Sequence, residues 1–198
     1  MEQYRYPQFR LSVVYAAKFT AVTNASQIRS RIVRAASMVG SEGDAEREAV
    51  NFAVVNAKLI TSPLHLQTAI YQALMAESQG GLRTKTIHSE IIWALNPTNN
   101  ISEAIRRYGV SETSTDLIVV HVATSDVSNV EQRISSLVQG TMVPMSTLPQ
   151  TTDWSSVRKY YKLDTEPAMQ GLVGNTVKDR AVLDNVVVSS VAMKSVMA

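Results

Sequence analysis

Residues 82–109 read LRTKTIHSEIIWALNPTNNISEAIRRYG, and residues 110–123 continue as VSETSTDLIVVHVA. Within the first part, Ile91 to Leu95 is a short, continuous apolar run that a polar turn, Asn96 to Asn99, brings to an end. A strand that is covered on both faces has this kind of sequence. The pattern therefore predicts a buried strand from Ile91 to Leu95 that stops at Pro97.

The segment after that turn has the features of a short helix. Asn100 suits an N-cap, and Glu103, three residues later, can complete a capping box. Apolar side chains recur at helical spacing as far as Tyr108, and Gly109 follows where many helices end in a left-handed conformation. Leu117 to Val122 is then a second apolar run. The whole segment predicts a strand, a short helix and another strand.

The rest of the chain extends this alternation. Leu11 to Phe19 and Phe52 to Ile60 are predicted strands, and Gly40 to Glu48 and Thr141 to Thr152 are predicted loops. Helices are predicted to start at Asn24, at Ser62-Pro63, at Ser128 with Glu131 as a capping box, at Asp153 and at Pro167. We expect an α/β (α+β) fold: a single domain, residues 1–198, with a central mixed sheet of about four strands flanked by helices. Strand order, and whether a tail from about 186 to 198 is folded, stay open.

The composition limits the classes of function. The chain has 198 residues, 45% of them hydrophobic, which suits one domain with a substantial core. A formal charge of +2 permits an acidic partner but is lower than expected of a dedicated nucleic-acid-binding arm. The sequence has no cysteine, which excludes disulfides and cysteine-based catalysis or metal binding. No stretch has the roughly 18 consecutive apolar residues of a membrane span, so we expect a soluble intracellular protein.

The enzyme motifs that can be found fail in their context. Gly80 to Thr86 is only superficially like a phosphate-binding loop, because no glycine precedes Lys85 and a strand is predicted to follow. His88 to Glu90 matches half of a zinc deaminase motif whose cysteine pair is missing. His121 is expected in the core and His65 at the surface. We therefore expect no catalytic residue, no cofactor and no metal site.

Several short motifs, in this order, resemble the PRPK-binding protein family, the small (Cgi-type) subunit of the KEOPS (EKC) complex. They are Arg83-Thr84-Lys85-Thr86, Ser89-Glu90-Ile91-Ile92, the run from Leu95 to Ala104, and Tyr108-Gly109. Fainter similarity covers most of the chain, including Val22 to Ala25 and Val157 to Leu163. The sequence departs from the family at Ser37 to Val50, which looks like an insertion, and beyond about Val186, where the tail is longer.

The resemblance implies a non-catalytic subunit of a tRNA-modifying complex, located in the cytoplasm and nucleus. Such a subunit would bind and activate the kinase-like ATPase subunit. It would also help to recruit tRNA by its acceptor tail for the formation of threonylcarbamoyl-adenosine next to the anticodon, whose chemistry belongs to a separate transferase subunit. The alternative is a protein-binding scaffold that regulates a kinase without direct RNA contact.

Five residues of the central segment are candidates for RNA binding. Arg83 and Lys85 alternate along a segment predicted to be extended, so both would project to the same side. Asn99, Asn100 and Ser102 lie at a turn and a helix N-terminus, where backbone amides point outward. Together these groups suit a single-stranded phosphate backbone, with an apolar or aromatic wall for the bases. The three polar residues are equally well explained as turn and cap residues.

The last two predicted helices, Asp153 to Leu163 and Pro167 to Val177, carry apolar residues on more than one side. One side would cover the sheet, and the other would suit a groove on the kinase-like subunit. The candidate partner contacts are Val157, Tyr161, Met169, Leu172 and Val173. The alternative is that both helices are buried within the domain.

Overall fold

A single antiparallel sheet forms the centre of the molecule. The computed structural model describes residues 1–11, 13–165, 167 and 176–197. Within these ranges the strand order is β1-β2-β4-β3, and β5 pairs with residues 18–20 of β2, whereas β1 pairs with residues 13–16. The strands are β1 (Glu2–Arg5), β2 (Val13–Thr20), β3 (Ala53–Asn56), β4 (Leu117–Ala123) and β5 (Thr141–Val143).

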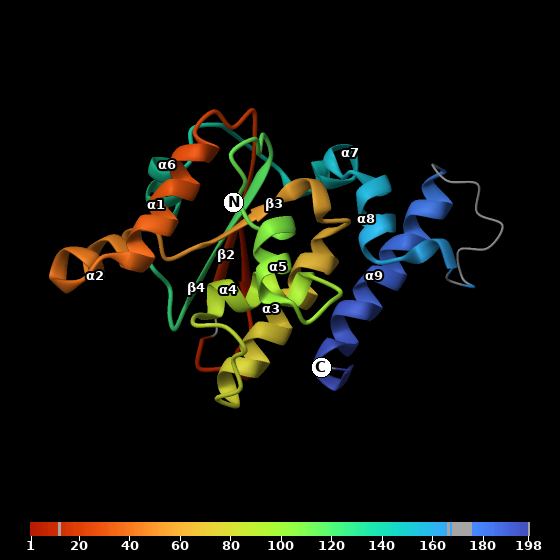
Figure 1. The fold of residues 1–198 in the computed structure, drawn as a ribbon, viewed down its shortest axis with the longest axis horizontal. Coiled ribbons are helices and arrows are strands. Elements are labelled where there is room, and N and C mark those ends of the chain that lie inside the picture. Colours follow the sequence, from red (N-terminus) through yellow and green to blue (C-terminus); the bar gives the residue numbers. More distant parts are fainter. Residues whose placement is uncertain (12, 166, 168–175, 198) are drawn as a thin grey trace.

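Helices lie on both sides of the strands, with α1 and α6 on one side and α3, α8 and α9 on the other (Figure 1). The helices are α1 (Ala25–Ser37), α2 (Gly40–Ala49), α3 (Pro63–Ser78), α4 (Ile87–Leu95), α5 (Ile101–Tyr108), α6 (Val130–Leu137), α7 (Leu148–Thr151), α8 (Trp154–Tyr160) and α9 (Val177–Met197). Short 3-10 helices span Ala57–Leu59, Met145–Thr147 and Leu163–Thr165.

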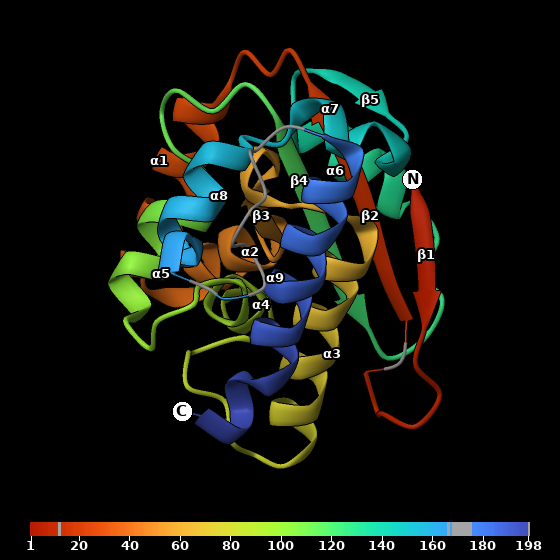
Figure 2. The same ribbon diagram turned by 90° about the vertical axis from the view of Figure 1, so that its right-hand side faces the viewer.

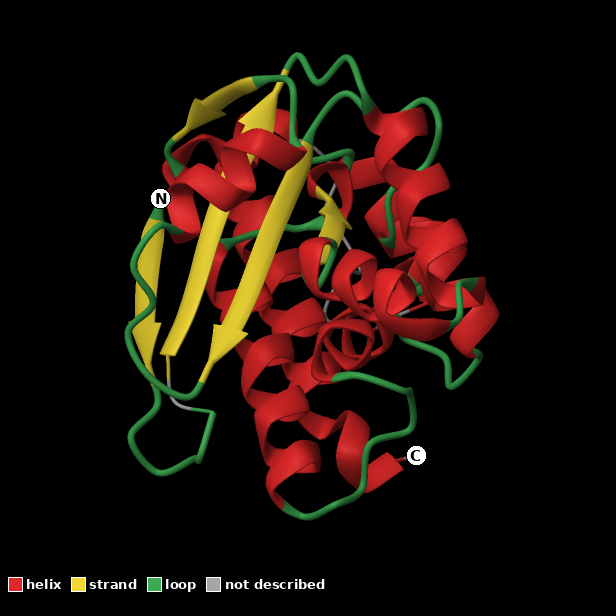
Figure 3. Cartoon of the chain, turned by 90° about the vertical axis from the view of Figure 1, so that its left-hand side faces the viewer, coloured by secondary structure: helices red, strands yellow, loops and turns green. Residues whose placement is uncertain are grey.

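The two faces of β2 belong to two separate cores, because successive side chains of a strand point to opposite faces. Val14 and Ala16 pack with α3, α4, α8 and α9. Val13, Tyr15 and Phe19 pack with α1 and α6. Both faces of the central strands are therefore covered, as Figure 3 shows. This explains why β2 and β4 are mostly apolar, with Lys18 and His121 as their buried polar residues.

The predicted fold class is confirmed, and so are most of the predicted caps. The side chains of Ser62, Asn100 and Asp153 accept hydrogen bonds from backbone amides in the first turns of α3, α5 and α8. The sheet differs in detail from the prediction: it has five strands within the described ranges, and every pairing between them is antiparallel rather than mixed.

The predicted strand from Ile91 to Leu95 is wrong, because these residues form the second half of helix α4. An apolar run of five residues fits a buried helix as well as a buried strand, and α4 is covered by α3, α5 and the sheet. The sequence signal that was missed is the N-cap of α4. Thr86 and Ser89 form a reciprocal capping box, with Thr86 as the N-cap.

Both predicted loops contain regular structure. Residues 40–48 lie in α2, where Gly43 serves helix packing: a Cβ there would lie 2.7 Å from the Met38 carbonyl oxygen. Arg31 and Glu46 link α1 to α2 through a side-chain pair with an N–O distance of 2.9 Å. Residues 141–152 contain β5, a 3-10 helix and α7. A polar, glycine-bearing sequence misled the first prediction, and two prolines without a periodic pattern misled the second.

Three boundary predictions also need correction. The strand predicted from Phe52 to Ile60 ends at Asn56, whose side chain accepts from the Lys58 amide and starts a 3-10 turn. The N-cap of α6 is Asn129, with φ 69°, rather than Ser128. Gly109 is extended, with φ −75°, and not left-handed. Glycine is still favoured there, because an added Cβ would lie 2.5 Å from the Ile105 carbonyl oxygen.

The stretch from 186 to 197 belongs to α9, which runs alongside α3 (Figure 2). Leu183, Val187 and Val191 are buried against the core on that face of the sheet. Polar contacts add to this packing, since Thr61 donates to Asp184 and the Gln72 amide donates to the Ala192 carbonyl at 2.7 Å. The part of the tail within the described residues is thus folded onto the domain.

Candidate functional site

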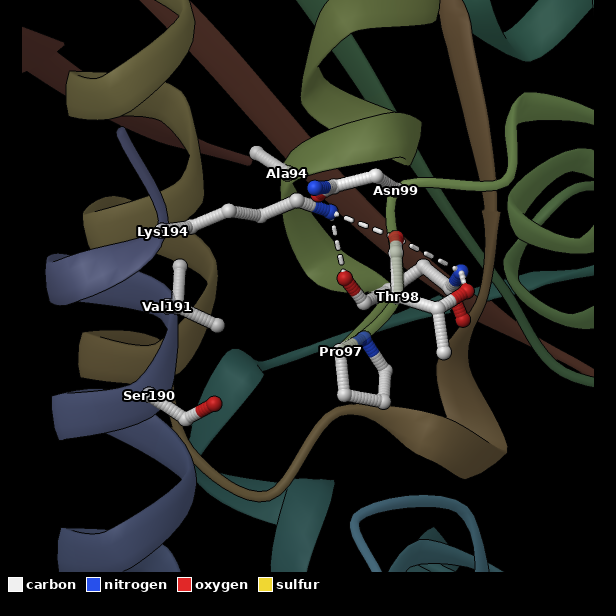
Figure 4. A pocket seen from close by; sticks show the side chains of 8 residues that line it. Ala94, Pro97, Thr98, Asn99, Ser190, Val191 and Lys194 are labelled. Atoms are coloured by element: carbon white, nitrogen blue, oxygen red, sulfur yellow. Dashed lines mark hydrogen bonds between the residues drawn. The ribbon is translucent and has the colours of Figure 1, made fainter. Parts of the chain in front are cut away.

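The end of α9 and the turn between α4 and α5 enclose a pocket of about 190 Å³ (Figure 4). The turn comprises residues 96–100 and is called the 96–100 turn below. From α9 the pocket takes Ser190, Val191 and Lys194, and from the turn it takes Pro97, Thr98 and Asn99 among others. Lys194 extends from the helix toward the turn.

Lys194 is 5% exposed, and its ammonium group makes three hydrogen bonds. It donates to the backbone carbonyls of Trp93, Asn96 and Thr98, the last at 3.1 Å. The same nitrogen lies 3.9 Å from the centroid of the Trp93 ring, which is a cation–π distance. Desolvation by burial lowers the pKa of Lys194 to about 8, and the charge of Glu90 opposes this shift.

The 96–100 turn is also held by its own side chains. The Asn96 amide donates to the carbonyl and hydroxyl oxygens of Thr98, at 3.1 and 2.8 Å. The Thr98 hydroxyl donates to Glu103, whose other carboxylate oxygen pairs with Arg107 at 2.7 Å. The hydrogen bond from Thr98 is the main cause that lowers the pKa of the Glu103 carboxyl. Glu103 therefore fastens the turn to α5 and does not close the predicted capping box with Asn100.

A second pocket, of about 250 Å³, adjoins the first and shares Ala94 and Lys194 with it. Arg83, Glu90 and Trp93 are among its lining residues. Glu90 is 1% exposed, and its Oε2 accepts from the amide and the hydroxyl of Thr84, at 2.8 and 2.7 Å. Its Oε1 has no hydrogen-bond partner among the described residues. This carboxylate thus holds the segment that carries Arg83.

The five candidate RNA residues form what we call the candidate RNA face: Arg83, Lys85, Asn99, Asn100 and Ser102. All five are exposed. Arg83 and Asn99 line the two adjoining pockets on either side of Lys194, whereas the other three line neither. Asn100 accepts from the Glu103 amide at 3.0 Å. Residues 83–86 form bends and not a strand. Alternation along an extended segment therefore does not place Arg83 and Lys85 on the same side.

Two apolar side chains are exposed on the helix that follows the turn. Ile101 and Ile105, one helical turn apart on α5, are 38% and 51% exposed. They supply an apolar surface next to Asn100 and Ser102 along the chain. Sequence reasoning assigned both to the helix stripe and overlooked their exposure.

The predicted partner contacts are only in part within the described residues. Val157 is fully buried and Tyr161 is 9% exposed, and both belong to the core that α8 shares with the sheet. The Tyr161 hydroxyl donates to the Leu95 carbonyl at 2.7 Å. For α8 the structure thus matches the alternative of burial within the domain. Met169, Leu172 and Val173 lie outside the described residues.

The three histidines lie inside the fold. Burial lowers the pKa of both His65 and His88 to about 3, and it also lowers the pKa of His121. His121 is a core residue as expected, but His65, expected at the surface, is fully buried between Thr61 and Tyr161. Among the described residues, no group of three or more His, Asp or Glu side chains is placed to hold a metal ion.

Comparison with known proteins assigns the family. A family model described as kinase binding protein CGI-121 matches residues 19–195. The chain belongs to the CGI-121 family. The matched range extends from the end of β2 to the last turn of α9, so it includes both pockets and Lys194.

Curated relatives of the CGI-121 family have the same name in several fungi. A protein of Cryptococcus neoformans is 32% identical over 234 aligned residues, covering 100% of both chains, and is named EKC/KEOPS complex subunit CGI121. A relative with that name in Neurospora crassa is also 32% identical, and the alignment covers 91% of each chain. In Kluyveromyces lactis the relative is 32% identical, and the alignment covers 73% of this chain and 82% of the relative. These names describe a subunit of a complex, and the family description names a kinase as the bound partner.

Lys194 and Glu90 are the two residues of this site that sequence reasoning missed. A signal for Lys194 was present: Leu183, Val187 and Val191 form an apolar stripe at helical spacing, and Lys194 continues it. A lysine that continues a buried stripe must find acceptors inside the fold. Its acceptors lie about a hundred positions earlier in the chain, which no local pattern reveals.

Proposed function

We propose that this chain is the non-catalytic CGI121 subunit of an EKC/KEOPS complex. In this role it binds and activates the kinase-like ATPase subunit, and it helps to recruit tRNA by the acceptor tail for threonylcarbamoyl-adenosine formation next to the anticodon. The threonylcarbamoyl transferase subunit is reached through the complex. The observation that carries the proposal is the match of a kinase-binding family over residues 19–195, together with relatives that are named as complex subunits. In this proposal the protein acts in the cytoplasm and nucleus.

The RNA part of the proposal is supported by the chemistry of the candidate RNA face. Arg83 and Lys85 supply exposed cations, and Asn99, Asn100 and Ser102 supply polar groups at the N-terminus of α5. Phosphate groups of a single strand suit both kinds of donor. Ile101 and Ile105 offer the apolar surface on which unpaired bases can pack. The fixed 96–100 turn lowers the entropy that would be lost on binding.

The kinase part is tested by binding between the purified chain and the kinase-like subunit, measured by calorimetry and by ATP hydrolysis. We expect a stable complex and faster hydrolysis in its presence. Copurification from native extract, with identification of the partners, should recover the other complex subunits. Absence of the kinase-like subunit from such material, combined with no binding between purified proteins, would contradict the proposal.

The RNA part is tested by replacing Arg83 and Lys85 together with alanine. If both contact phosphates, tRNA affinity falls, and the slope of log affinity against log salt becomes flatter by about 1.4, since each contact to a single strand contributes roughly 0.7. Stability should change by about 0.5 kcal/mol or less, because both residues are exposed. The matched control removes Arg29 and Lys178, two exposed cations elsewhere.

Salt-dependent binding also separates the proposal from the alternative. A scaffold that regulates the kinase without RNA contact would show no salt-dependent tRNA binding by the isolated chain, and the Arg83 and Lys85 variant would behave as wild type. Equal salt slopes for that variant and for the Arg29 and Lys178 control would remove the candidate RNA face from the account.

A further inference from the structure

The C-terminal helix ends in an internal lysine that is tied to a distant part of the chain. Lys194 lies in the last turn of α9, and its three carbonyl acceptors are 101, 98 and 96 positions away in sequence. An ammonium group has three N–H donors, so each donor has one acceptor. The side chain is 5% exposed, so water does not compete effectively for these contacts. A satisfied buried cation of this kind fixes the geometry of its acceptors.

Those acceptors belong to the end of α4 and to the turn after it. The last carbonyls of a helix lack intrahelical partners and carry partial negative charge. The last turn of α4 has no basic residue of its own, and Pro97 prevents the helix from continuing. Lys194 therefore supplies from α9 the cation that α4 itself lacks, while its ammonium also lies over the Trp93 ring.

The hydrogen bonds that start at Lys194, called the Lys194 tie below, continue from the 96–100 turn into α5. Asn96 has no exposed surface and bonds to Thr98, which bonds to Glu103 in the first turn of α5. Glu103 pairs with Arg107, and the Arg107 guanidinium lies 4.3 Å from the ring centroid of Tyr160 on α8. The orientation of the α5 N-terminus is therefore set by a continuous network that begins at Lys194.

We propose that Lys194 is a positioning residue through which the C-terminal helix fixes the candidate RNA face. When Lys194 is in place, the 96–100 turn holds Asn99 and Asn100 in one arrangement, and Arg83 lies at the neighbouring pocket with the same lysine in its wall. When the end of α9 is displaced, the carbonyls of Asn96 and Thr98 lose the ammonium donor, the turn loosens and RNA affinity falls. The position of the end of α9 thus regulates the candidate RNA face. This inference rests on the RNA part of the proposed function.

The test uses the full chain with Lys194→Met, which keeps an unbranched side chain one atom shorter and removes the charge and the donors. The matched control is Lys178→Met, an exposed lysine at the other end of the same helix. Hydrogen exchange of the Asn96, Glu103 and Ala104 amides is measured without RNA. Affinities for an unmodified tRNA transcript and for the kinase-like subunit are measured in parallel.

We expect the three amides to exchange about tenfold faster in Lys194→Met, while amides of the β2–β4 ladder stay as in wild type. The affinity for tRNA should fall about fivefold or more, the lower end of usual coupling between sites. Binding to the kinase-like subunit should be unchanged, which a general loss of structure would not allow. The control should match wild type in all three measurements.

Each other outcome has a definite meaning. Unchanged exchange at the 96–100 turn overturns the Lys194 tie itself, whatever the RNA result. Faster exchange with unchanged tRNA affinity overturns the link to RNA but leaves the proposed function intact. If wild type does not bind tRNA, the proposed function fails, and the exchange data still decide the Lys194 tie.

A measurement on wild type covers the case in which Lys194→Met does not fold. Lysine acylation followed by peptide mass spectrometry should modify Lys194 at least about tenfold more slowly than Lys178, because its amine is buried and hydrogen-bonded. Equal rates for the two lysines would overturn the inference.

Discussion

Among single residues, Lys194 shows most clearly how burial and charge oppose each other in this protein. Three carbonyl oxygens and the Trp93 ring favour its ammonium form. Loss of hydration disfavours that form and is the larger effect, so the pKa falls to about 8 from an ordinary value of 10.5. The charge of Glu90 on α4 favours the ammonium form. Arg83 lines the second pocket together with Lys194.

This pKa gives a stability that depends on pH in a definite direction. Between about pH 8 and 10.5 the folded state gives up a proton that the unfolded state keeps, so the cost of burying the charge is relieved as the pH rises. Urea unfolding of wild type and Lys194→Met should show a free-energy difference that shifts in favour of wild type from pH 7.5 to 9.5. A difference that is constant over this range would contradict the lowered pKa.

Asn100 is the N-cap of α5. Its side chain accepts from the Glu103 amide at 3.0 Å, so Asn100→Ala should lower the free energy of unfolding by about 1 kcal/mol. Ser102→Ala, an exposed change in the same turn of α5, serves as the control and should stay within about 0.5 kcal/mol of wild type. Thermal or urea unfolding of both variants checks this, and equal stability of the two would remove Asn100 as a cap.

Among the elements, α4 shows why part of the fold could not be predicted from the sequence. A run of five apolar residues has no period, so its length and its start must decide between helix and strand. The helix α4 starts after its N-cap, Thr86, and the capping box between Thr86 and Ser89 identifies the segment as a helix. By contrast, α3, α5 and α8 have strong caps at Ser62, Asn100 and Asp153 and were predicted correctly.

Tyr161, which directly follows α8, is part of the core. Because Tyr161 is buried and its hydroxyl donates to the Leu95 carbonyl, Tyr161→Glu should lower the free energy of unfolding by about 3 to 5 kcal/mol. Lys159→Gln, an exposed change on the same helix, should have little effect. If Tyr161→Glu instead melts as wild type and fails only to bind the kinase-like subunit, the side chain is a partner contact and not a core residue.

For the molecule as a whole, the sequence predicted the class of fold. Strands covered on both faces, and caps at the right places, were visible as local patterns at β2, β4 and three helices. Arg83 and Asn99, both predicted from the sequence to contact RNA, line adjoining pockets, and their contact with RNA stays a prediction. Lys194, which lines both pockets, was not predicted, because it reaches this region only when α9 packs along α3 and α4.

The packing of α9 connects the C-terminal part of the described chain to the 96–100 turn. Leu183, Val187 and Val191 of α9 pack in the core on the α3 and α4 side of the molecule, and the end of the helix lies at the 96–100 turn. Within the described residues, no helix is long and apolar enough to cross a membrane. The proposed tRNA recruitment would place an RNA contact on the same domain that belongs to a kinase-binding family.

The most direct test of this account is the affinity of the isolated chain for one tRNA with and without its single-stranded acceptor tail. We predict that removal of the tail weakens binding to wild type by about tenfold or more, since unpaired bases and their phosphates supply the contacts. The same removal should have little effect on the variant that lacks Arg83 and Lys85. Equal affinity of wild type for the intact and the shortened tRNA would contradict recruitment by the acceptor tail.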